Sequence, residues 1–594
     1  MFSLRRILRG PEQSVRSFAV QAGEPVVVRE NTVFEILTRH LLDRLVNNEA
    51  LGEEIPTRVT QLAYTVSLPG VLVSLYLFAA YHQPHAIGPR PLWLQIADHY
   101  FYVLYAFVIM GAATVFEWDL LFPDLLDVFV LTTLPIPRQR LLLARLLALA
   151  IYLALVLIGT NFLGVLFFPA VADLHHMWWR HVTAHTIAVA LAGAFTAAFF
   201  VALQGTLLCL LGRKLFAWIS PLTQALSIVL LLTVLFLFPL IASHLQPLLR
   251  SSSTVVLLFP PLWFLGVYER LLWGSAAPLV FTELARTAVL ATATVFALAV
   301  LTYPHAYARR TRQLIEGGIA AHRRSTVAQA CRSVLHLTLL RSPQQRAIYH
   351  FISQTLLRTQ RLHLYLSIYT GLGISLVLSG LLLLRIQPGH INFAFSTYGI
   401  RNAIPILAFW IAIGLRTALN APIGRQGSWL FRVVHGDPLR EHIHAVHLWV
   451  VVCVSTVTIA AALLLHRLAP SGLQGLWPLT TQLLVAVGLS VLLTDIFFLR
   501  AKDIPFTVTR QPSTKDLPIS FVRYFVVFPA FALYISDREP WVEANPAHIA
   551  IALSLVVAFH VLLRTMHNRY FIGRETNPPQ SDSVLAHRLG LQEY

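Results

Sequence analysis

Four histidines near position 440 have the chemistry of metal ligands. His435, His442, His444 and His447 fall within one short segment, and His444 and His447 share a face if that segment is helical. Neutral imidazoles bind zinc or iron, so a membrane-embedded metalloenzyme that uses His435 to His447 is one interpretation. The spacing matches no standard enzyme motif, and arginines fill the same stretch, so we predict a solvated inner loop with no bound metal.

A second histidine group alternates with two tryptophans on the predicted outer side. Its members are His175, His176, Trp178, Trp179, His181 and His185. Tryptophan and other rings with one polar edge collect at membrane–water interfaces. We therefore predict that this group anchors the chain at the outer interface and binds no metal.

The positions of the lysines exclude a Walker loop, the phosphate-binding loop of many ATPases. The chain has only Lys214, Lys502 and Lys515, and none of them follows a glycine. A Walker loop needs Gly-Lys at its end, with backbone amides that cradle phosphate. The sequence therefore predicts no ATPase, no catalytic residue and no cofactor in this chain.

The elements that carry these residues are membrane helices. Of the 594 residues, 56% are hydrophobic and only 12% charged, and the apolar residues form blocks long enough to cross about 30 Å of hydrocarbon. This pattern predicts an all-α, polytopic integral membrane protein with about 12 transmembrane helices in two six-helix halves. The predicted spans are 60–81, 98–117, 142–168, 184–211, 220–243, 280–303, 363–384, 397–415, 446–466, 478–499, 518–536 and 547–564.

The charge distribution predicts the orientation of these helices. The formal net charge is +17, and most of the Lys and Arg residues fall in alternate connecting segments. The positive-inside rule therefore places the N- and C-termini in the cytoplasm. The charge forms no long basic face with interleaved aromatic residues, so no nucleic-acid partner is predicted.

The predicted domains follow from these spans. They are a cytoplasmic tail with an interfacial amphipathic helix at 1–58, a first membrane half at 59–303, a basic cytoplasmic linker at 304–362, a second membrane half at 363–565 and a cytoplasmic tail at 566–594. The amphipathic helix carries the apolar stripe Val33, Phe34, Leu37, Leu41 and Leu45. We expect it to lie in the inner membrane interface, or else to pack as a soluble helix on the inner loops.

Charged residues near the spans do not suggest an ion relay. Asp495 and Arg523 lie near the predicted inner ends of spans, and Glu283 and Arg286 lie near the outer end of another. Such side chains reach polar surroundings by snorkelling. A secondary carrier would need charges at the middle of the bilayer, and none is predicted there.

The segment between the second and third spans has the design of a short helix below the membrane. It contains acids, a short apolar stretch, Pro135 and Pro137, and then the cations Arg138 and Arg140. The prolines end a helix before the next span begins. The sequence therefore predicts a short amphipathic helix that is presented to a partner on the inner side.

The pattern Phe-Pro-Asp-x-x-Asp…Leu-Pro-Ile…Arg in this segment resembles the permease subunits of bacterial type 2 ABC exporters. The resemblance implies that the segment is the coupling helix that docks on a separate ATPase. The residues that carry it are Phe122, Pro123, Asp124, Asp127, Leu134, Pro135, Arg138 and Arg140. Typical members have six spans, so twelve spans imply two permease halves fused in one chain.

Two shorter stretches are similar to the same family. Pro260, Pro261, Trp263 and Phe264 lie in a segment like the re-entrant hairpin that members place over the outer exit. The run Asp-Ile-Pro-Phe-Thr at 503–507 is similar to an inner-loop motif. Bulky aromatic residues in the hairpin would then cap the exit.

The resemblance implies a membrane permease of an ATP-driven exporter in the bacterial plasma (inner) membrane. Two copies of a separate ABC ATPase and membrane lipid would be its partners, and the pattern does not identify a substrate. A single-chain secondary carrier of the major-facilitator type remains an alternative, because it also has six plus six spans with inner termini. The Gly-x-x-x-Asp-Arg motif of that family is missing between spans two and three.

Overall fold

A computed structural model describes most of the chain. The described residues are 30–46, 56–82, 90–131, 133–172, 177–250, 254–316, 336, 340, 342–387, 390–421, 440–470, 474–499, 505–506 and 516–575. The chain divides into two compact units, one made mainly of residues 1–321 and the other mainly of residues 322–594. The domain boundaries predicted from the spans remain a prediction.

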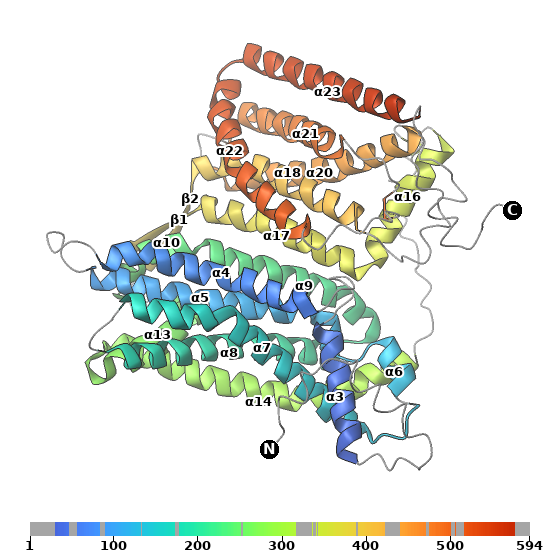
Figure 1. Cartoon of the computed structure of the whole chain (residues 1–594). Coiled ribbons are helices and arrows are strands. Elements are labelled where there is room, and N and C mark those ends of the chain that lie inside the picture. The colour runs from blue at the N-terminus through green and yellow to red at the C-terminus, as the bar shows by residue number, and fades with distance from the viewer. Residues whose placement is uncertain are drawn as a thin grey trace. The chain divides into compact units, whose positions relative to one another are not determined.

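The first unit is built from helices (Figure 1). They are α3 (Glu30–Val46), α4 (Pro56–Tyr81), α5 (Leu92–Phe116), η2 (Trp118–Leu120), α6 (Leu125–Leu131), α7 (Arg138–Ala172), α8 (Trp178–Leu210), α9 (Arg213–Phe236), α10 (Phe238–Ser243), α11 (Leu245–Arg250), α12 (Thr254–Leu258), α13 (Pro260–Trp273), η3 (Gly274–Ala276) and α14 (Leu279–Ile315). Proline stands in the first turn of α10 and α13, where its missing N–H leaves no hydrogen bond unmade. The long helices α4, α5, α7, α8 and α14 pack against one another.

The second unit is also helical. Its elements and the hairpin within its sequence are α16 (Pro343–Arg358), α17 (Gln360–Leu381), β1 (Leu382–Gln387), β2 (His390–Phe395), α18 (Thr397–Leu419), α20 (Arg440–Leu468), α21 (Leu476–Phe498), α22 (Asp516–Ala544) and α23 (Pro546–Glu575). Ser342 and Ser396 cap α16 and α18 by accepting backbone N–H bonds. Most of α18 is buried, so this helix forms the core of the unit.

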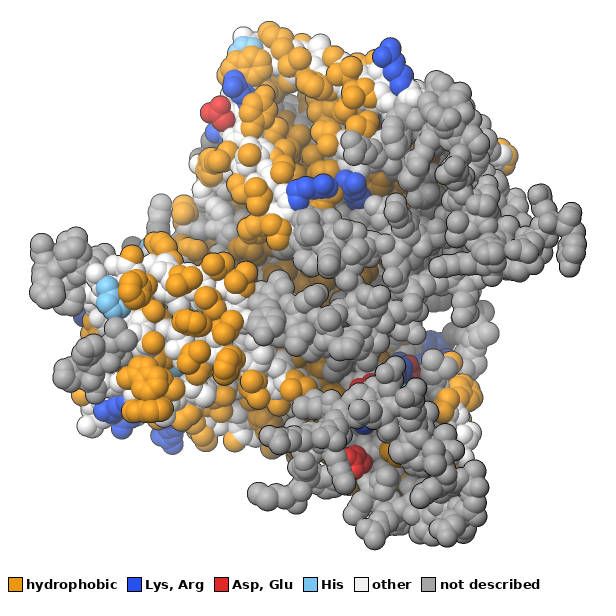
Figure 2. Space-filling model, in the orientation of Figure 1, with side chains coloured by type: hydrophobic (Ala, Val, Ile, Leu, Met, Phe, Trp, Pro, Cys, Tyr) orange, Lys and Arg blue, Asp and Glu red, His pale blue; other side chains and the backbone are white. Residues whose placement is uncertain are grey.

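Ten helices among the described residues are long and apolar enough to cross a membrane. They are 92–116, 138–172, 178–210, 213–236, 279–315, 362–381, 397–419, 442–468, 476–498 and 546–569. Figure 2 shows the corresponding surface, where hydrophobic side chains cover wide areas of the helices and charged side chains are few. The chain is an all-α, multi-pass membrane protein, as the hydropathy pattern predicts.

Helices also lie at the other two predicted spans, although the side chains of each are described only in part. The described apolar part of α4 is Ser67–Tyr81. The other helix, α22, carries Arg523, Asp537 and Arg538 and has prolines at 529 and 540.

Two features differ from the sequence expectation. The hairpin of β1 and β2 was not predicted, because its apolar residues read as the end of a span and the start of the next. In α3, Leu37, Leu41 and Leu45 are buried in a cluster that includes Leu141 of α7. The apolar stripe of α3 therefore packs on protein, which favours the packed helix over one lying in the membrane interface.

Candidate functional site

The segment between α5 and α7 folds as a short helix closed by turns at both ends. Asp124 precedes α6, and its Oδ1 accepts a hydrogen bond of 2.8 Å from the backbone N–H of Asp127. This is a helix N-cap, which satisfies a donor that the first turn would otherwise leave without a partner. Pro135 and Pro137 follow, and α7 begins at Arg138. The predicted short helix followed by prolines is therefore present.

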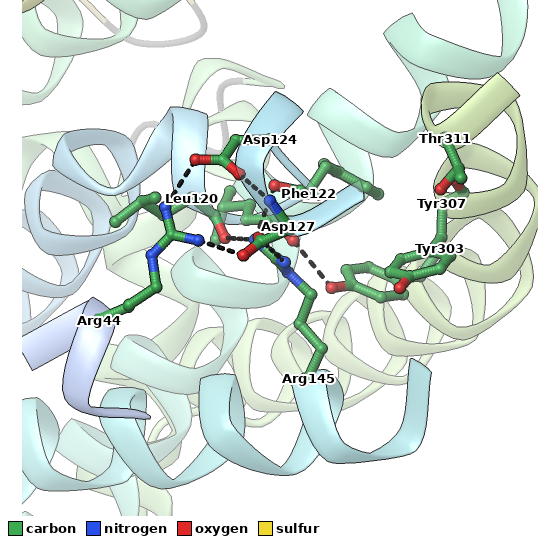
Figure 3. A network of polar contacts seen from close by, with 10 residues as sticks. Arg44, Leu120, Phe122, Asp124, Asp127, Arg145, Tyr303, Tyr307 and Thr311 are labelled. Carbon is green, nitrogen blue, oxygen red and sulfur yellow. Dashed lines mark hydrogen bonds and ion pairs between the residues drawn. The ribbon is translucent and has the colours of Figure 1, made fainter. Parts of the chain in front are cut away.

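A cation from the N-terminal helix α3 reaches this segment. Nη2 of Arg44 lies 2.6 Å from Oδ2 of Asp124, and Nη1 of Arg44 donates to Oδ1 of Asp127. Figure 3 shows Arg44 and Arg145 approaching Asp127 from different helices. Arg44 therefore fastens α3 to the start of α6 through two carboxylates at once.

A second cation, Arg145 of α7, holds the same segment from the membrane side. Its Nη1 lies 2.6 Å from Oδ2 of Asp127, and its Nη2 donates to the backbone oxygens of Leu120 and Phe122 at 2.8 and 2.7 Å. Both Arg145 and Asp127 are buried. A planar guanidinium with several donors suits this task better than an ammonium group. Together, Arg44, Arg145, Asp124 and Asp127 form what we call the arginine clamp.

Helix α14 contacts the clamped segment next to the arginines. The phenol of Tyr303 donates a 2.8 Å hydrogen bond to the backbone oxygen of Leu121. The ring of Tyr303 stacks on Phe122, with ring centroids 4.9 Å apart. Phe122 and Tyr303 are both buried, so this contact ties the segment to α14 inside the core of the first unit.

Further hydrogen bonds come from α8 and α9. Gln204 of α8 donates to the backbone oxygen of Trp118 at 2.6 Å, and the indole of Trp118 donates to Ser220 of α9 at 2.9 Å. Gln224 of α9 donates to the backbone oxygen of Val115. The segment from Val115 to Asp127 is therefore held by polar contacts from α3, α7, α8, α9 and α14.

The charges of the clamp balance one another. Burial by itself would raise the pKa of Asp124, but the hydrogen bonds from Arg44 and from the N–H of Asp127 lower that pKa below its ordinary value. Two guanidinium groups face two carboxylates, so the clamp has no net charge when Asp124 and Asp127 are ionised. This neutrality makes the partial burial of four charges tolerable.

The face of α6 opposite the clamp is exposed and apolar. Leu125, Phe129 and Val130 are 51%, 61% and 58% exposed, and Leu134 beyond the helix is 44% exposed. Arg138 is also exposed at the start of α7. Such a row of apolar side chains, fixed by a polar clamp on one side, is typical of an interaction surface.

The structure separates the predicted coupling residues into two groups. Phe122, Pro123, Asp124 and Asp127 lie in or next to the clamp, whereas the others face outward. The outward group is Leu134, Pro135, Arg138 and Arg140, of which Arg140 is half-buried. The sequence pattern does not predict Arg44, Arg145 or Tyr303 at this site, since they come from other helices.

No known protein family, curated protein or solved structure matches this chain significantly. Its function has to be inferred from its own residues and contacts.

The predicted outer hairpin contains α12 and α13. Pro260 and Pro261 form the first turn of α13, as expected of helix-starting prolines. Phe264 is fully buried, with its ring 5.3 Å from that of Phe195, and the indole of Trp263 donates to the backbone oxygen of Leu257. Phe264 is thus a core residue of the first unit, and Trp263 is the more exposed of the two aromatics.

The interpretation of the outer histidines as interfacial anchors is wrong for two of them. His181 and His185 of α8 are buried, and their rings lie 5.8 and 5.7 Å from that of Tyr268. They pack in the core because α8 turns one side toward α5 and α13. His175 and His176 lie outside the described residues, while Trp179 is exposed as an anchor would be.

The histidines near position 440 stand on a helix, which corrects the predicted loop. His442, His444 and His447 belong to α20, and His435 lies outside the described residues. His447 and His560 approach Asp495, with the His560 Nδ1 to Asp495 Oδ2 distance at 2.5 Å. Within the described part of the chain, no group of three or more His, Cys, Asp or Glu side chains is arranged to hold a metal.

The inner-loop motif at 503–507 is described only at Pro505 and Phe506. Phe506 is buried, has a positive φ of 68° and donates its N–H to the backbone oxygen of Leu419. The other three residues of the motif lie outside the described residues, as do residues 317–335 of the predicted linker and the tail beyond residue 575.

Proposed function

We propose that this chain is the membrane permease of an ATP-driven exporter of the ABC type. Its two six-helix halves form the pathway, and two copies of a separate ATPase bind it on the inner side of a bacterial plasma membrane. The chain itself catalyses no bond chemistry. The proposal rests on the sequence pattern of the coupling segment together with one structural observation, the arginine clamp behind the exposed apolar face of α6.

The clamp attaches the coupling segment rigidly to the membrane helices, and coupling to an ATPase requires such an attachment. ATP binding draws two ATPase subunits together, and a permease must convert that movement into a change of its helices. A loosely attached loop would absorb the movement. The contacts of Arg145 and Tyr303 pass a displacement of α6 to α7 and α14, which are two of the long apolar helices.

The exposed face of α6 supports the same proposal. Leu125 and Phe129 point away from the clamp and offer an apolar contact, and Arg138 and Arg140 add charge beside them. Interfaces commonly combine a small apolar centre with a charged rim. We therefore expect the ATPase to present an apolar groove with acidic residues at its edge.

The decisive experiment is co-purification of the chain with a separate ABC ATPase from the same cells. Leu125→Ser combined with Phe129→Ser should abolish co-purification and ATP-dependent transport while the protein still inserts in the membrane. Arg138→Glu combined with Arg140→Glu should weaken both about tenfold or more, since a lost charge contact at a partly desolvated interface is worth about 1 to 3 kcal/mol. Ile315→Ser, an exposed apolar position at the end of α14, is the matched control.

Three results would overturn the proposal. The first is normal ATPase binding and transport in the Leu125 and Phe129 double variant. The second is transport that follows a proton gradient with no ATPase present, which would favour a secondary carrier of the major-facilitator type. Purified chain that hydrolyses ATP alone would also contradict it, because no Walker loop is present in the sequence.

A further inference from the structure

A buried acid and a buried histidine meet in the first unit, near the start of α5, whereas the clamped segment follows the end of that helix. Nδ1 of His99 in α5 lies 2.6 Å from Oε1 of Glu269 in α13, and their side chains are 3% and 1% exposed. Oε2 of Glu269 accepts a 3.0 Å hydrogen bond from the indole N–H of Trp273. Oε1 of Glu269 therefore faces an imidazole nitrogen and Oε2 faces an indole N–H, so both oxygens of the buried carboxyl group have a polar partner.

The arginines of this region are engaged with other groups. Arg90 pairs with Asp98 through two contacts of 2.7 and 2.8 Å and lies over the ring of Tyr81. Arg270 donates to the backbone oxygen of Gly274, and Arg180 donates to that of Leu271. In the described part of the chain, His99 is the only titratable cation within ion-pair distance of Glu269.

The remaining titratable groups around the pair are aromatic. His99 stacks on Tyr268 of α13 with ring centroids 4.3 Å apart, and His181 of α8 meets His99 edge-on at 5.2 Å. His185 of α8 places Nδ1 3.4 Å from the hydroxyl of Tyr268. Tyr102 of α5 donates to the backbone oxygen of Gly70 in α4, and its hydroxyl lies 2.6 Å from Ser74. None of these groups carries a positive charge when His181 and His185 are neutral.

We propose that His99 and Glu269 form a proton-binding site in which an imidazolium of His99 pairs with the carboxylate of Glu269. With neutral His99, the site would contain a lone carboxylate in an apolar, fully buried setting, which is costly. When Nε2 of His99 takes up one proton from a hydronium ion, one N–H bond forms, one O–H bond breaks and water is released, and the pair becomes net neutral. A second or third imidazolium at His181 or His185 would place like charges together, so the site takes one proton.

Proton binding at this site fixes α13 against α5. Glu269, Tyr268 and Trp273 all belong to α13, and His99 touches the first two directly. Loss of the proton at alkaline pH leaves a buried anion and weakens the attachment of α13. This inference does not depend on the proposed transport function and concerns another part of the first unit.

A double-mutant cycle as a function of pH tests the site. Wild type, His99→Gln, Glu269→Gln and the double variant are purified in detergent, and their thermal unfolding is followed between pH 6.5 and 9.5. A histidine that gains an acidic partner on folding adds stability at low pH and loses it as pH rises. We therefore expect the coupling between positions 99 and 269 to fall about twofold or more over this range, since a charge-assisted hydrogen bond is about twice as strong as a neutral one.

The control variant is His185→Gln. His185→Gln removes a neighbouring imidazole that does not touch the carboxylate, and it should leave the pH dependence of the coupling unchanged. A coupling that is equal at pH 6.5 and 9.5 would reduce the pair to a neutral hydrogen bond and overturn the proposal. If Glu269→Gln fails to fold, Glu269→Asp is compared with wild type and His99→Gln outside the cycle: it retains the charge and should preserve the pH dependence of stability, which His99→Gln should lose.

Infrared spectroscopy gives a second, independent measurement. The difference spectrum of wild type minus Glu269→Gln at pH 7 should contain the bands of an ionised carboxylate. The band of a protonated carboxyl group in that spectrum would mean that Glu269 itself holds the proton and that His99 is neutral. That result would also overturn the assignment of an imidazolium.

Discussion

Arg145 lies 2.6 Å from the buried carboxylate of Asp127, a residue 18 positions earlier in the chain. The same guanidinium donates hydrogen bonds to the backbone oxygens of Leu120 and Phe122. One side chain of α7 therefore sets the path of the segment before α6. Arg44 approaches the other oxygen of Asp127 from α3. One carboxylate thus joins two helices that are separated in sequence by the first spans.

Replacing Asp127 by Asn should be among the most destabilising single changes on the predicted inner side. The change leaves Arg145 buried without its anionic partner, and breaking a buried pair in this way costs about 3 to 5 kcal/mol. The melting temperature of the purified protein in detergent is the measurement. Asp537→Asn, at an exposed carboxylate of α22, should change the melting temperature little, and an equal loss in both variants would contradict the role of the clamp.

Replacing Arg44 by Met should release α3 from α6 without unfolding the rest of the unit. The methionine keeps apolar contacts near Leu41 and Leu45, while the charge contacts to Asp124 and Asp127 are lost. Limited proteolysis should then cut within α3, Glu30–Val46, faster than in wild type. Cleavage at the wild-type rate would show that the apolar stripe of α3 alone holds the helix in place.

The attachment of α3 should weaken in acid. The pKa of Asp124 is lowered in the folded protein, although burial opposes this, because Arg44 and the N–H of Asp127 bond to its carboxylate. A depressed folded-state pKa adds stability above the unfolded value, about 3.9 for Asp, and that stability is lost as pH falls through the folded value. The stability difference between wild type and Asp124→Asn should therefore shrink between pH 5 and pH 3, whereas a constant difference would exclude titration of Asp124 as the cause.

Tyr303→Phe removes the polar contacts of one hydroxyl, which bonds to the backbone oxygen of Leu121 and to the side chain of Arg145. It removes the donor to the backbone oxygen of Leu121 and leaves the stacked ring on Phe122 in place. A buried oxygen without its donor costs about 1 to 3 kcal/mol. The matched control is Tyr307→Phe, one turn further along α14, which should change the free energy of unfolding by less. If the order of the two variants is reversed, Tyr303 acts only through its ring.

Gly266→Ala tests the close packing of α13 on α14. A Cβ at this glycine would come within 2.5 Å of the Cβ of Leu284 and 2.9 Å of the backbone nitrogen of Ala285. Overpacking of this kind costs about 1 to 3 kcal/mol. Gly380→Ala, where a Cβ would meet nothing within 4 Å, is the control and should be neutral or slightly stabilising. A thermal shift assay on both variants measures the difference.

The sequence predicts the helices well because their apolar blocks are long. The block at 397–415, for example, becomes α18 at Thr397–Leu419, with an error only at the end of the helix. The block at 142–168 becomes the longer α7, which begins at Arg138 right after Pro137. Polar residues extend helices beyond the hydrocarbon, and hydropathy does not mark where they stop.

The partners of the charged residues could not be predicted in the same way. Arg44 and Asp124 are 80 residues apart, and His99 and Glu269 are 170 apart, so only the packing of helices brings them together. His181 and His185 were misread because the sequence shows which residues stand near a span end but not which side of the helix faces protein. Burial of a polar side chain depends on that orientation.

Helix α14 is a single helix of 37 residues. Leu284 near its start packs against Gly266 of α13, and Tyr303 further along it holds Leu121 before α6. No proline separates these two positions, which lie roughly 28 Å apart along the helix axis at 1.5 Å per residue. The helix also packs on α8, so a single supported element carries both contacts. A displacement of α14 at one contact is therefore carried to the other, and any coupling free energy between the two contacts is reciprocal.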